Sequence, residues 1–418
     1  MKTEQSKFMR TGKNVIFFMV AFTMFGCLSR KHQITPDPLS SQENIVLVPS
    51  AVDGKGYLTA LDGQTGSIKW EMPFYGDVKI GREKLFLNQA AYNRIEKYSD
   101  TLSLYTNAPL TKNLLTIDPF TGKSVGEVYN LLKPGFHLSC CHELQVNQLI
   151  GVENEVAFMA LMFRGPFSNG SATTQKFTVY ATELKTGSVK WTTDIPTTKI
   201  PAFDDLVNAM LVKDSKIYIG GMQYSLILDA QTGKTVQGFS IGKLIEPVDG
   251  NFYKTERDKV IAVDSKSGAV KWQFTRENMP LSKPAISDGV LFTAADDGKL
   301  YAFDAQTGSK KWEVQIKNAN NGGFHALQVN DGLLYGTFMN GQMYAIDPGN
   351  GSIKWEAQLD LNFYVSPWNF QIRGNFVYAW DLVNRVVALD KKTGRQIWDK
   401  SMKGVFQYNY PAVFTKDN

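Results

Sequence analysis

Short runs of apolar residues recur along this chain and are separated by tight polar segments. One complete unit has apolar runs at 284–286, 289–293, 299–303 and 310–314. The intervals between them are short and contain Gly, Asp and Ser, which favour turns. We find no long segment with the 3.6-residue apolar period of an amphipathic helix. The pattern therefore predicts four antiparallel strands per unit, connected as a meander.

The third run of each unit leads into one repeated phrase, Ala-x-Asp-x-x-Thr-Gly-x-x-x-Trp, which is complete at 60–70 and 302–312. The Asp side chain can hydrogen-bond the backbone two residues later, and Gly can adopt the positive φ of a tight hairpin loop. Gly is present in all eight copies, at Gly66, Gly122, Gly187, Gly233, Gly268, Gly308, Gly351 and Gly394. Trp is present in six copies, at Trp70, Trp191, Trp272, Trp312, Trp355 and Trp398. We expect these large rings to lie at the seams between neighbouring sheets, where they bury much apolar surface.

Two copies lack the Trp: Gly126 and Gln237 occupy its place. A period of roughly 40 residues with several strands per unit is typical of a β-propeller. We therefore expect an all-β fold in one domain, residues 44–418, with eight blades of four antiparallel strands. The first unit begins with what matches a second strand, at 44–48, and residues 410–414 match the missing first strand. The C-terminal strand is thus predicted to close the ring, which removes exposed sheet edges.

The early units are longer than the later ones because they contain insertions. These fall at 91–109, 133–142 and 164–175. Insertions in repeat proteins emerge on one face, and binding often takes place there. We expect the partner-binding region in these loops.

The N-terminus has a different character from the repeats. A basic segment precedes the apolar run at 15–25, which is too short for a comfortable membrane span and is followed by Gly26 and Cys27. This order resembles a bacterial lipoprotein signal peptide over residues 1–26, with lipid attachment at Cys27 and a flexible tether over 27–43. Leu28 after the cysteine favours the outer membrane. Ordinary signal cleavage, or an uncleaved anchor with an incidental Cys27, remains the alternative.

The charge of the chain points away from nucleic acid. The formal net charge is +5, and residues 1–26 contain four Lys or Arg and one Glu. The remainder is therefore close to neutral, with acidic and basic residues interspersed. No basic stripe of the kind that follows a phosphate backbone is present. We expect a monomeric propeller that contacts protein partners and no nucleic acid.

Cys140 and Cys141 are adjacent, within the segment 137–142. Two such thiols outside the cytoplasm can form a vicinal disulfide, and a small buried pair is the other interpretation. A zinc site needs about four converging ligands, whereas neighbouring strand residues point to opposite faces. We therefore expect no metal site here.

The repeated phrase resembles the tryptophan-docking motif of the pyrroloquinoline-quinone (PQQ) propeller superfamily, over residues 44–414. That superfamily includes PQQ-dependent alcohol dehydrogenases and also non-catalytic BamB-like outer-membrane assembly lipoproteins. A lipoprotein signal, a short tether and a propeller with little else is the BamB-like layout. The resemblance implies a lipid-anchored scaffold of the outer membrane that faces the periplasm, with the β-barrel assembly complex as partner.

Two alternatives stay open. In the dehydrogenases a vicinal disulfide lies against PQQ, a Trp stacks on its other face, and Glu, Asn and Asp hold calcium. Cys140–Cys141 fits the first element, and Trp368 or Trp380 could supply the second. No local motif matches the calcium ligands or the catalytic Asp, so we expect no catalytic residue and no cofactor. The third possibility is an envelope lipoprotein with an unrelated private partner.

Overall fold

A computed structural model describes most of the chain between residues 43 and 415. The described ranges are 43–52, 55–73, 76–80, 85–89, 95–97, 103–105, 114–123, 144–164, 174–195, 210–220, 224–240, 247–316, 324–338, 341–361, 370–381, 383–404 and 411–415. The chain divides into two units, Met1–Pro36 and Asp37–Asn418. All described residues belong to the second unit, and the expected signal peptide at 1–26 lies outside them.

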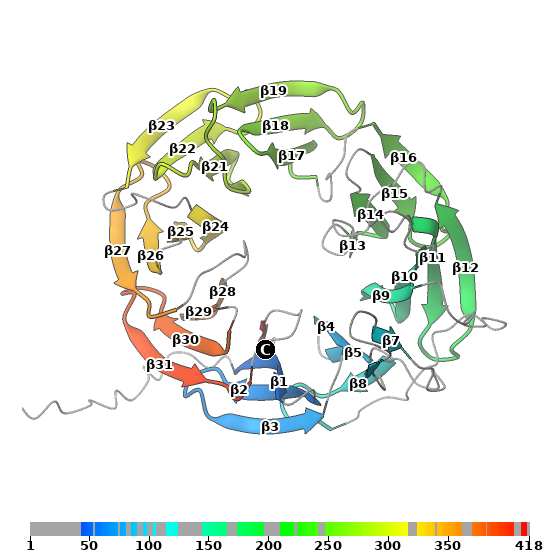
Figure 1. Cartoon of the computed structure of the whole chain (residues 1–418). Helices are drawn as coiled ribbons and strands as arrows, with labels where there is room; N and C mark the ends of the chain where they lie inside the picture. Colours follow the sequence, from blue (N-terminus) through cyan, green and yellow to red (C-terminus); the bar gives the residue numbers. More distant parts are fainter. Residues whose placement is uncertain are drawn as a thin grey trace, which may run out of the picture. The chain divides into compact units, whose positions relative to one another are not determined.

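Every regular element in the described residues is a β-strand, and the strands form nine sheets (Figure 1). Six sheets have four strands. In spatial order these are β3 (Ile68–Pro73), β2 (Lys55–Asp62), β1 (Asn44–Val52) and β32 (Ala412–Thr415); β12 (Val189–Ile195), β11 (Thr174–Glu183), β10 (Val156–Arg164) and β9 (Leu144–Glu153); β13 (Met210–Lys213), β14 (Lys216–Gly220), β15 (Ser225–Asp229) and β16 (Thr235–Phe239); β20 (Ala285–Ser287), β21 (Val290–Ala294), β22 (Lys299–Asp304) and β23 (Lys310–Gln315); β24 (Phe324–Asn330), β25 (Leu333–Phe338), β26 (Gln342–Ile346) and β27 (Ile353–Gln358); β28 (Phe370–Arg373), β29 (Phe376–Trp380), β30 (Arg385–Asp390) and β31 (Gln396–Ser401).

The remaining sheets are smaller. Two have three strands: β4 (Gly76–Ile80), β5 (Leu85–Gln89) and β8 (Leu114–Ile117); and β17 (Asn251–Glu256), β18 (Lys259–Asp264) and β19 (Val270–Thr275). The last is the hairpin of β6 (Ile95–Lys97) and β7 (Ser103–Tyr105). Apart from this hairpin, the sheets follow one another around a ring within Asp37–Asn418 (Figure 1).

All pairings between neighbouring strands in these sheets are antiparallel, as the apolar runs predicted. The unit predicted from 284 to 314 is present as β20–β23, with boundaries within one residue of the prediction. The all-β propeller of four-stranded antiparallel blades is therefore confirmed as an architecture.

The predicted number of blades needs correction. In seven sheets the described residues reach the outer strand, and in the sheet β4–β5–β8 they end with the turn after β8. The structure thus shows seven blades and not eight. The incomplete unit is one of the two without Trp: Gly126 stands there, outside the described residues. That sequence offers no indole to fix an outer strand against the next blade.

The core lies between neighbouring sheets. The strand that leads into the repeated turn is called the third strand here, also in the three-stranded sheet β17–β19. The third strands β18, β22 and β30 have four consecutive buried residues, whereas the outer strands β19 and β23 contain alternating half-buried and exposed positions. A strand covered on both faces is expected to be apolar throughout, and an outer strand only on one face. The fully buried side chains include four tyrosines, Tyr180, Tyr335, Tyr344 and Tyr378.

The first sheet combines strands from both ends of the described chain. β32 pairs with β1 in antiparallel register, from Asn44 opposite Thr415 to Leu47 opposite Ala412. Val413 is buried against Val46 and Val48 in a cluster that also includes side chains of β29–β31. The part of the chain that the structure describes has no helix of a length and apolarity sufficient to cross a bilayer.

Candidate functional site

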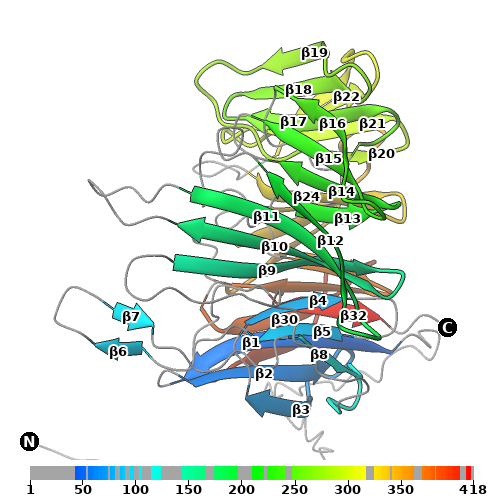
Figure 2. The same cartoon turned by 90° about the vertical axis from the view of Figure 1, so that its right-hand side faces the viewer.

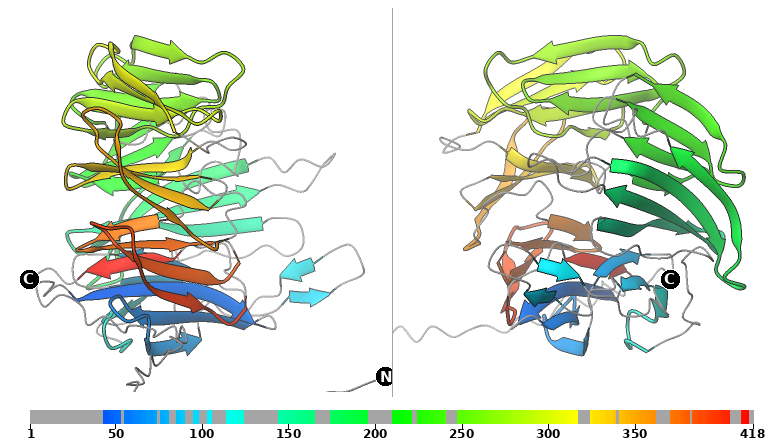
Figure 3. Two further views of the ribbon diagram at one scale, coloured as in Figure 1. Left: turned by 90° about the vertical axis from the view of Figure 1, so that its left-hand side faces the viewer. Right: turned by 45° about the vertical axis from the view of Figure 1, so that its right-hand side comes forward.

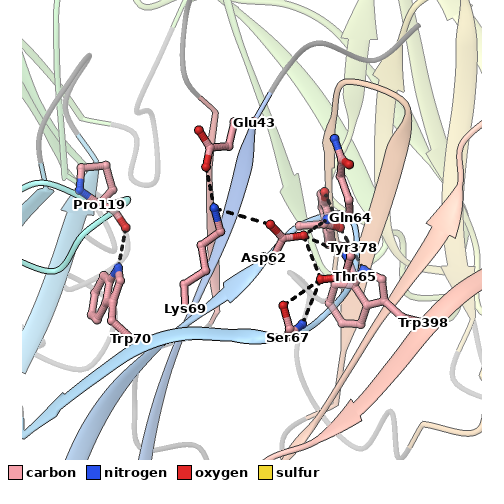
Figure 4. Close-up of polar contacts among 11 residues, drawn as sticks. Glu43, Asp62, Gln64, Thr65, Ser67, Lys69, Trp70, Pro119, Tyr378 and Trp398 are labelled. Atoms are coloured by element: carbon pink, nitrogen blue, oxygen red, sulfur yellow. Dashed lines mark hydrogen bonds and ion pairs between the residues drawn. The ribbon is translucent and has the colours of Figure 1, made fainter. Parts of the chain in front are cut away.

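The repeated turn is built from backbone hydrogen bonds that Asp and Gly make possible. In the first copy the N–H of Gly66 donates to the carbonyl oxygen of Asp62 at 2.8 Å, and the N–H of Asp62 donates to the carbonyl oxygen of Ser67 at 2.8 Å. A carboxylate oxygen of Asp62 accepts from the N–H of Thr65 at 2.9 Å and from its hydroxyl at 3.0 Å (Figure 4). All eight copies make the same two backbone bonds.

These hydrogen bonds stabilise the charged form of the turn carboxylates. The pKa of Asp304 is lowered first by the backbone N–H of Thr307 and then by its hydroxyl. Ser267 has the same two effects on the pKa of Asp264, and Thr232 lowers the pKa of Asp229 first through its hydroxyl. In each case the carboxylate is the acceptor, so ionisation is favoured.

The indoles of all six motif Trp residues lie between neighbouring blades. Each Nε1–H donates to the carbonyl oxygen of the residue after the turn Asp of the next described turn, at 2.8–3.0 Å. The pairs are Trp70–Pro119, Trp191–Ala230, Trp272–Ala305, Trp312–Pro348, Trp355–Lys391 and Trp398–Gly63. Two of them, Trp70–Pro119 and the ring of Trp398 beside the first turn, are drawn in Figure 4.

The turn Gly provides the surface on which the indole rests. Gly394 has a φ of +71°, and a Cβ on it would lie 2.5 Å from the ring of Trp355. Gly66 has the same relationship to Trp398, with 2.8 Å. Glycine is thus required twice, once for its positive φ and once because the ring occupies the space of a side chain.

The residue before the Trp carries a feature that the sequence analysis did not use. In each of the seven outer strands this residue is skipped in the pairing with the third strand, as in a β-bulge. In five strands it is a Lys, at Lys69, Lys190, Lys271, Lys311 and Lys354. Three of these pair with the Asp of their own turn, Lys354 with Asp347 at 2.9 Å, Lys69 with Asp62 at 3.5 Å and Lys311 with Asp304 at 3.9 Å. Bulges and Lys are both known to protect edge strands from pairing with other chains.

The blade with Gln237 in place of Trp has a different seam. The side-chain amide of Gln237 donates to the carbonyl oxygen of Lys266, one residue beyond the carbonyl used by the indoles. The ring space over the turn glycine is taken by Phe239: a Cβ on Gly268 would lie 2.7 Å from its Cδ1. Phe239 also meets Phe252 edge-on, with ring centroids 5.3 Å apart. The loss of Trp is therefore compensated by a residue two positions later, which the sequence analysis missed.

Among the described residues, no side chain covers the turn glycine of the blade that follows the other unit without Trp. Gly187, the turn glycine of the following blade, has a φ of +70°, and no described atom lies within 4 Å of a Cβ built on it.

The remaining predicted residues are placed as follows. Trp380 is 1% exposed and packs within a cluster of apolar side chains between β29–β31 and the first sheet, so neither face of its ring is open to a ligand. Trp368, Cys27, Cys140 and Cys141 lie outside the described residues. Within the described ranges no group of three or more His, Cys, Asp and Glu side chains could hold a metal ion.

Of the three predicted binding loops, parts of two are described. The segment 91–109 contains the β6–β7 hairpin, and 164–175 contains the ends of β10 and β11, whereas 133–142 lies outside the described residues. The hairpin and the adjoining ends of β10 and β11 lie on the same side of the ring (Figure 2; Figure 3, left).

Known proteins with similar sequences include members of one propeller family. The family model described as "Outer membrane protein assembly factor BamB" matches residues 168–274 and 228–371. BamB of Moranella endobia (strain PCIT) is 29% identical over 105 residues, which cover 25% of this chain and 24% of that protein. The serine/threonine-protein kinase AfsK of Streptomyces griseus is 28% identical over 120 residues, 25% of this chain and 15% of the kinase.

The matched segments thus span about a quarter or less of the length of these curated relatives. Among solved structures, the computationally designed Ika8 protein has a TM-score of 0.50 at 13% identity, covering 82% of this chain and 94% of that chain. At this identity the likeness concerns the fold alone. The family model and the curated relatives together support a PQQ-like, BamB-like propeller family for the repeats of this chain.

Proposed function

We propose that this protein is a non-catalytic scaffold of the cell envelope that binds protein partners and aids the assembly of outer-membrane β-barrel proteins. The observation that carries the proposal is the match of residues 168–371 to the family described as outer membrane protein assembly factor BamB. The chemistry of the repeats supports it. Motif carboxylates are engaged in turns, motif indoles in seams, and Trp380 in the core.

The same proposal includes the way the scaffold is held in the envelope. Residues 1–26 act as a lipoprotein signal peptide, Cys27 receives the lipid, and 27–43 form a tether. The propeller is then a monomer on the periplasmic side of the outer membrane. The pairing of β32 with β1 supports a ring closed by the C-terminal strand. The scaffold uses no metal and no cofactor.

For the docking region we propose the early-blade insertions 91–109, 133–142 and 164–175. The position of the β6–β7 hairpin on the same side as the ends of β10 and β11 supports a common binding face (Figure 2). A rigid ring suits this role, because loops held by a fixed framework lose little entropy when they bind.

Crosslinking of the tagged full-length protein in its own cells, followed by mass spectrometry, tests the proposal. We expect the subunits of the barrel-assembly complex, linked through the early-blade insertions. A Cys27→Ala variant, which removes the proposed lipid attachment, should lose membrane association and retain the fold. Recovery of unrelated envelope proteins instead would refute the assembly role. Dye-linked alcohol oxidation after addition of PQQ and calcium would refute the non-catalytic role.

A further inference from the structure

The outer strand of one blade differs from the other six in charge. The strands β3, β12, β19, β23, β27 and β31 each contain at least one Lys, Asp or Glu. β16 reads Thr-Val-Gln-Gly-Phe and contains none. It is the terminal strand of its sheet, so its outward backbone N–H and C=O groups have no strand partner among the described residues. Such an edge can accept an added strand, and charged side chains are the usual protection against this.

The difference in side chains between β16 and the other outer strands is clearest at the bulge, the residue that is skipped in the pairing. All seven outer strands keep the skipped residue before the Trp position, so the bulge itself does not distinguish β16. In β16 the residue is Val236, whose side chain is 56% exposed. In β31 the equivalent Ile397 is half-buried against the apolar cluster beneath it. Val236 therefore presents an exposed apolar side chain where five other strands present Lys.

The strand β16 is held in place by contacts with the neighbouring blade. Phe239 is 4% exposed and packs between blades, and Gln237 is hydrogen-bonded to the next turn. Between them Gly238 lies under the hydroxyl of Tyr224, where any Cβ would collide with it. β16 thus has two side chains held against the neighbouring blade and an outer edge without charged side chains.

Unpaired positive charge stands beside this edge. Lys234 directly precedes the strand, and Lys266 belongs to the turn whose carbonyl accepts from Gln237. Both are exposed, and neither has an ion-pair partner among the described residues. A segment that is uncharged along β16 and acidic at one end would complement this arrangement.

We propose that the free edge of β16 takes up an extended segment of a partner protein, uncharged along the strand and acidic at the end beside Lys234 and Lys266. The segment adds a strand to the sheet β13–β16: main-chain hydrogen bonds hold it, and Val236 offers an apolar contact. This inference rests on the proposed scaffold function and names the chemistry of the segment that the scaffold receives.

Binding of a defined peptide tests the edge directly. The probe is a fluorescein-labelled peptide of about eight residues, alternating Val and Thr with one terminal Glu, which has the length of a typical strand. Anisotropy titration is carried out with the full-length chain and two variants. Val236→Lys restores the residue that five sister strands carry, so it should fold normally. Val270→Lys places a charge on β19, at a residue that is 53% exposed and lies beside Lys271.

We expect Val236→Lys to weaken the affinity for the peptide by about tenfold or more, and Val270→Lys to change it by less than about twofold. A peptide with Lys in place of Glu should bind more weakly than the original. Equal binding to the protein and to Val236→Lys, or no binding by the unchanged protein, would overturn the inference. Because the titration involves no assembly complex, it can succeed when the cellular crosslinking fails, and the two failures are distinguishable.

Discussion

The phenyl ring of Phe239 lies against Gly268, in the place that an indole takes at six other seams. The ring is smaller than an indole and has no N–H, and the amide of Gln237 supplies the donor separately. One residue of the repeat is thus replaced by two, which divide its packing and its hydrogen bond between them. The contact between the two blades is thus retained although this copy of the repeat lacks the Trp.

Phe239→Ala should therefore destabilise the fold strongly. It removes a buried ring that touches both Gly268 and Phe252, and such truncations cost about 3–5 kcal/mol. Urea unfolding followed by tryptophan fluorescence measures the change. The control Val236→Ala removes a mostly exposed side chain on the same strand and should stay within about 0.5 kcal/mol. Equal effects of the two changes would show that Phe239 does not hold the seam.

Gly394→Ala and Gly187→Ala form a matched pair. Both residues have positive φ, +71° and +70°, so alanine pays a similar backbone cost of about 1–2 kcal/mol at each. At Gly394 the added methyl group also meets the ring of Trp355, whereas at Gly187 it meets no described atom. We expect a clearly lower urea midpoint for Gly394→Ala. The same midpoint for both variants would mean that the indole contact contributes nothing.

Tyr378→Phe should weaken the junction between the last sheet and the first. The Tyr378 hydroxyl donates to the carbonyl oxygen of Gly63 at 3.1 Å and accepts from Nδ2 of Asn44 at 3.0 Å. Loss of the hydroxyl leaves two buried groups without this partner, which costs about 1–3 kcal/mol. Among the described residues, the Tyr344 hydroxyl bonds only to Gln342 of its own strand, so Tyr344→Phe should cost less in the same thermal unfolding measurement.

The hydroxyl of Tyr378 should also resist ionisation. Burial raises its pKa well above the ordinary value of 10.0, and burial likewise raises the pKa of Tyr335 to about 12. Absorbance titration at 295 nm compares the chain with Tyr378→Phe and Tyr335→Phe. Neither substitution should remove a titration below about pH 11. A missing early titration in either variant would contradict the burial of that hydroxyl.

Stability should fall in acid because of the turn carboxylates. The pKa values of Asp229, Asp264, Asp304 and Asp347 are lowered below the ordinary 3.8 in the folded chain. Their contribution to the free energy of unfolding is therefore complete above pH 3.8 and is lost as the pH falls through the lowered values. Asp304→Asn should reduce the dependence of the urea midpoint on pH below 4.

The repeated turn was the part of the fold that the sequence predicted best. Asp and Gly determine a local backbone conformation, so each copy could be read without knowledge of its neighbours. The number of complete blades could not be obtained in this way. The turn at Asp118 forms like the others, yet the described residues show no outer strand after it. A turn depends on a few consecutive residues, whereas an outer strand also needs a contact from the adjoining blade.

The seams were only partly predictable. The position of Trp indicated where the indoles lie, and Lys before Trp in five copies was a readable signal for the bulge that was not used. Phe239 could not be recognised as the substitute for Trp, because its role depends on the space above Gly268. The insertions and the Cys pair gave no comparable signal, since neither belongs to the repeat.

The pairing of β1 with β32 has a consequence for the order in which the chain can fold. Among the described strands β1 comes first along the chain, and β32, which pairs with it, comes last. The later blades can form from local segments as they appear. In the first blade, the edge of β1 stays unpaired until residues 412–415 have been synthesised. The amides of β1 that face β32 should therefore be among the last to acquire their final protection against hydrogen exchange.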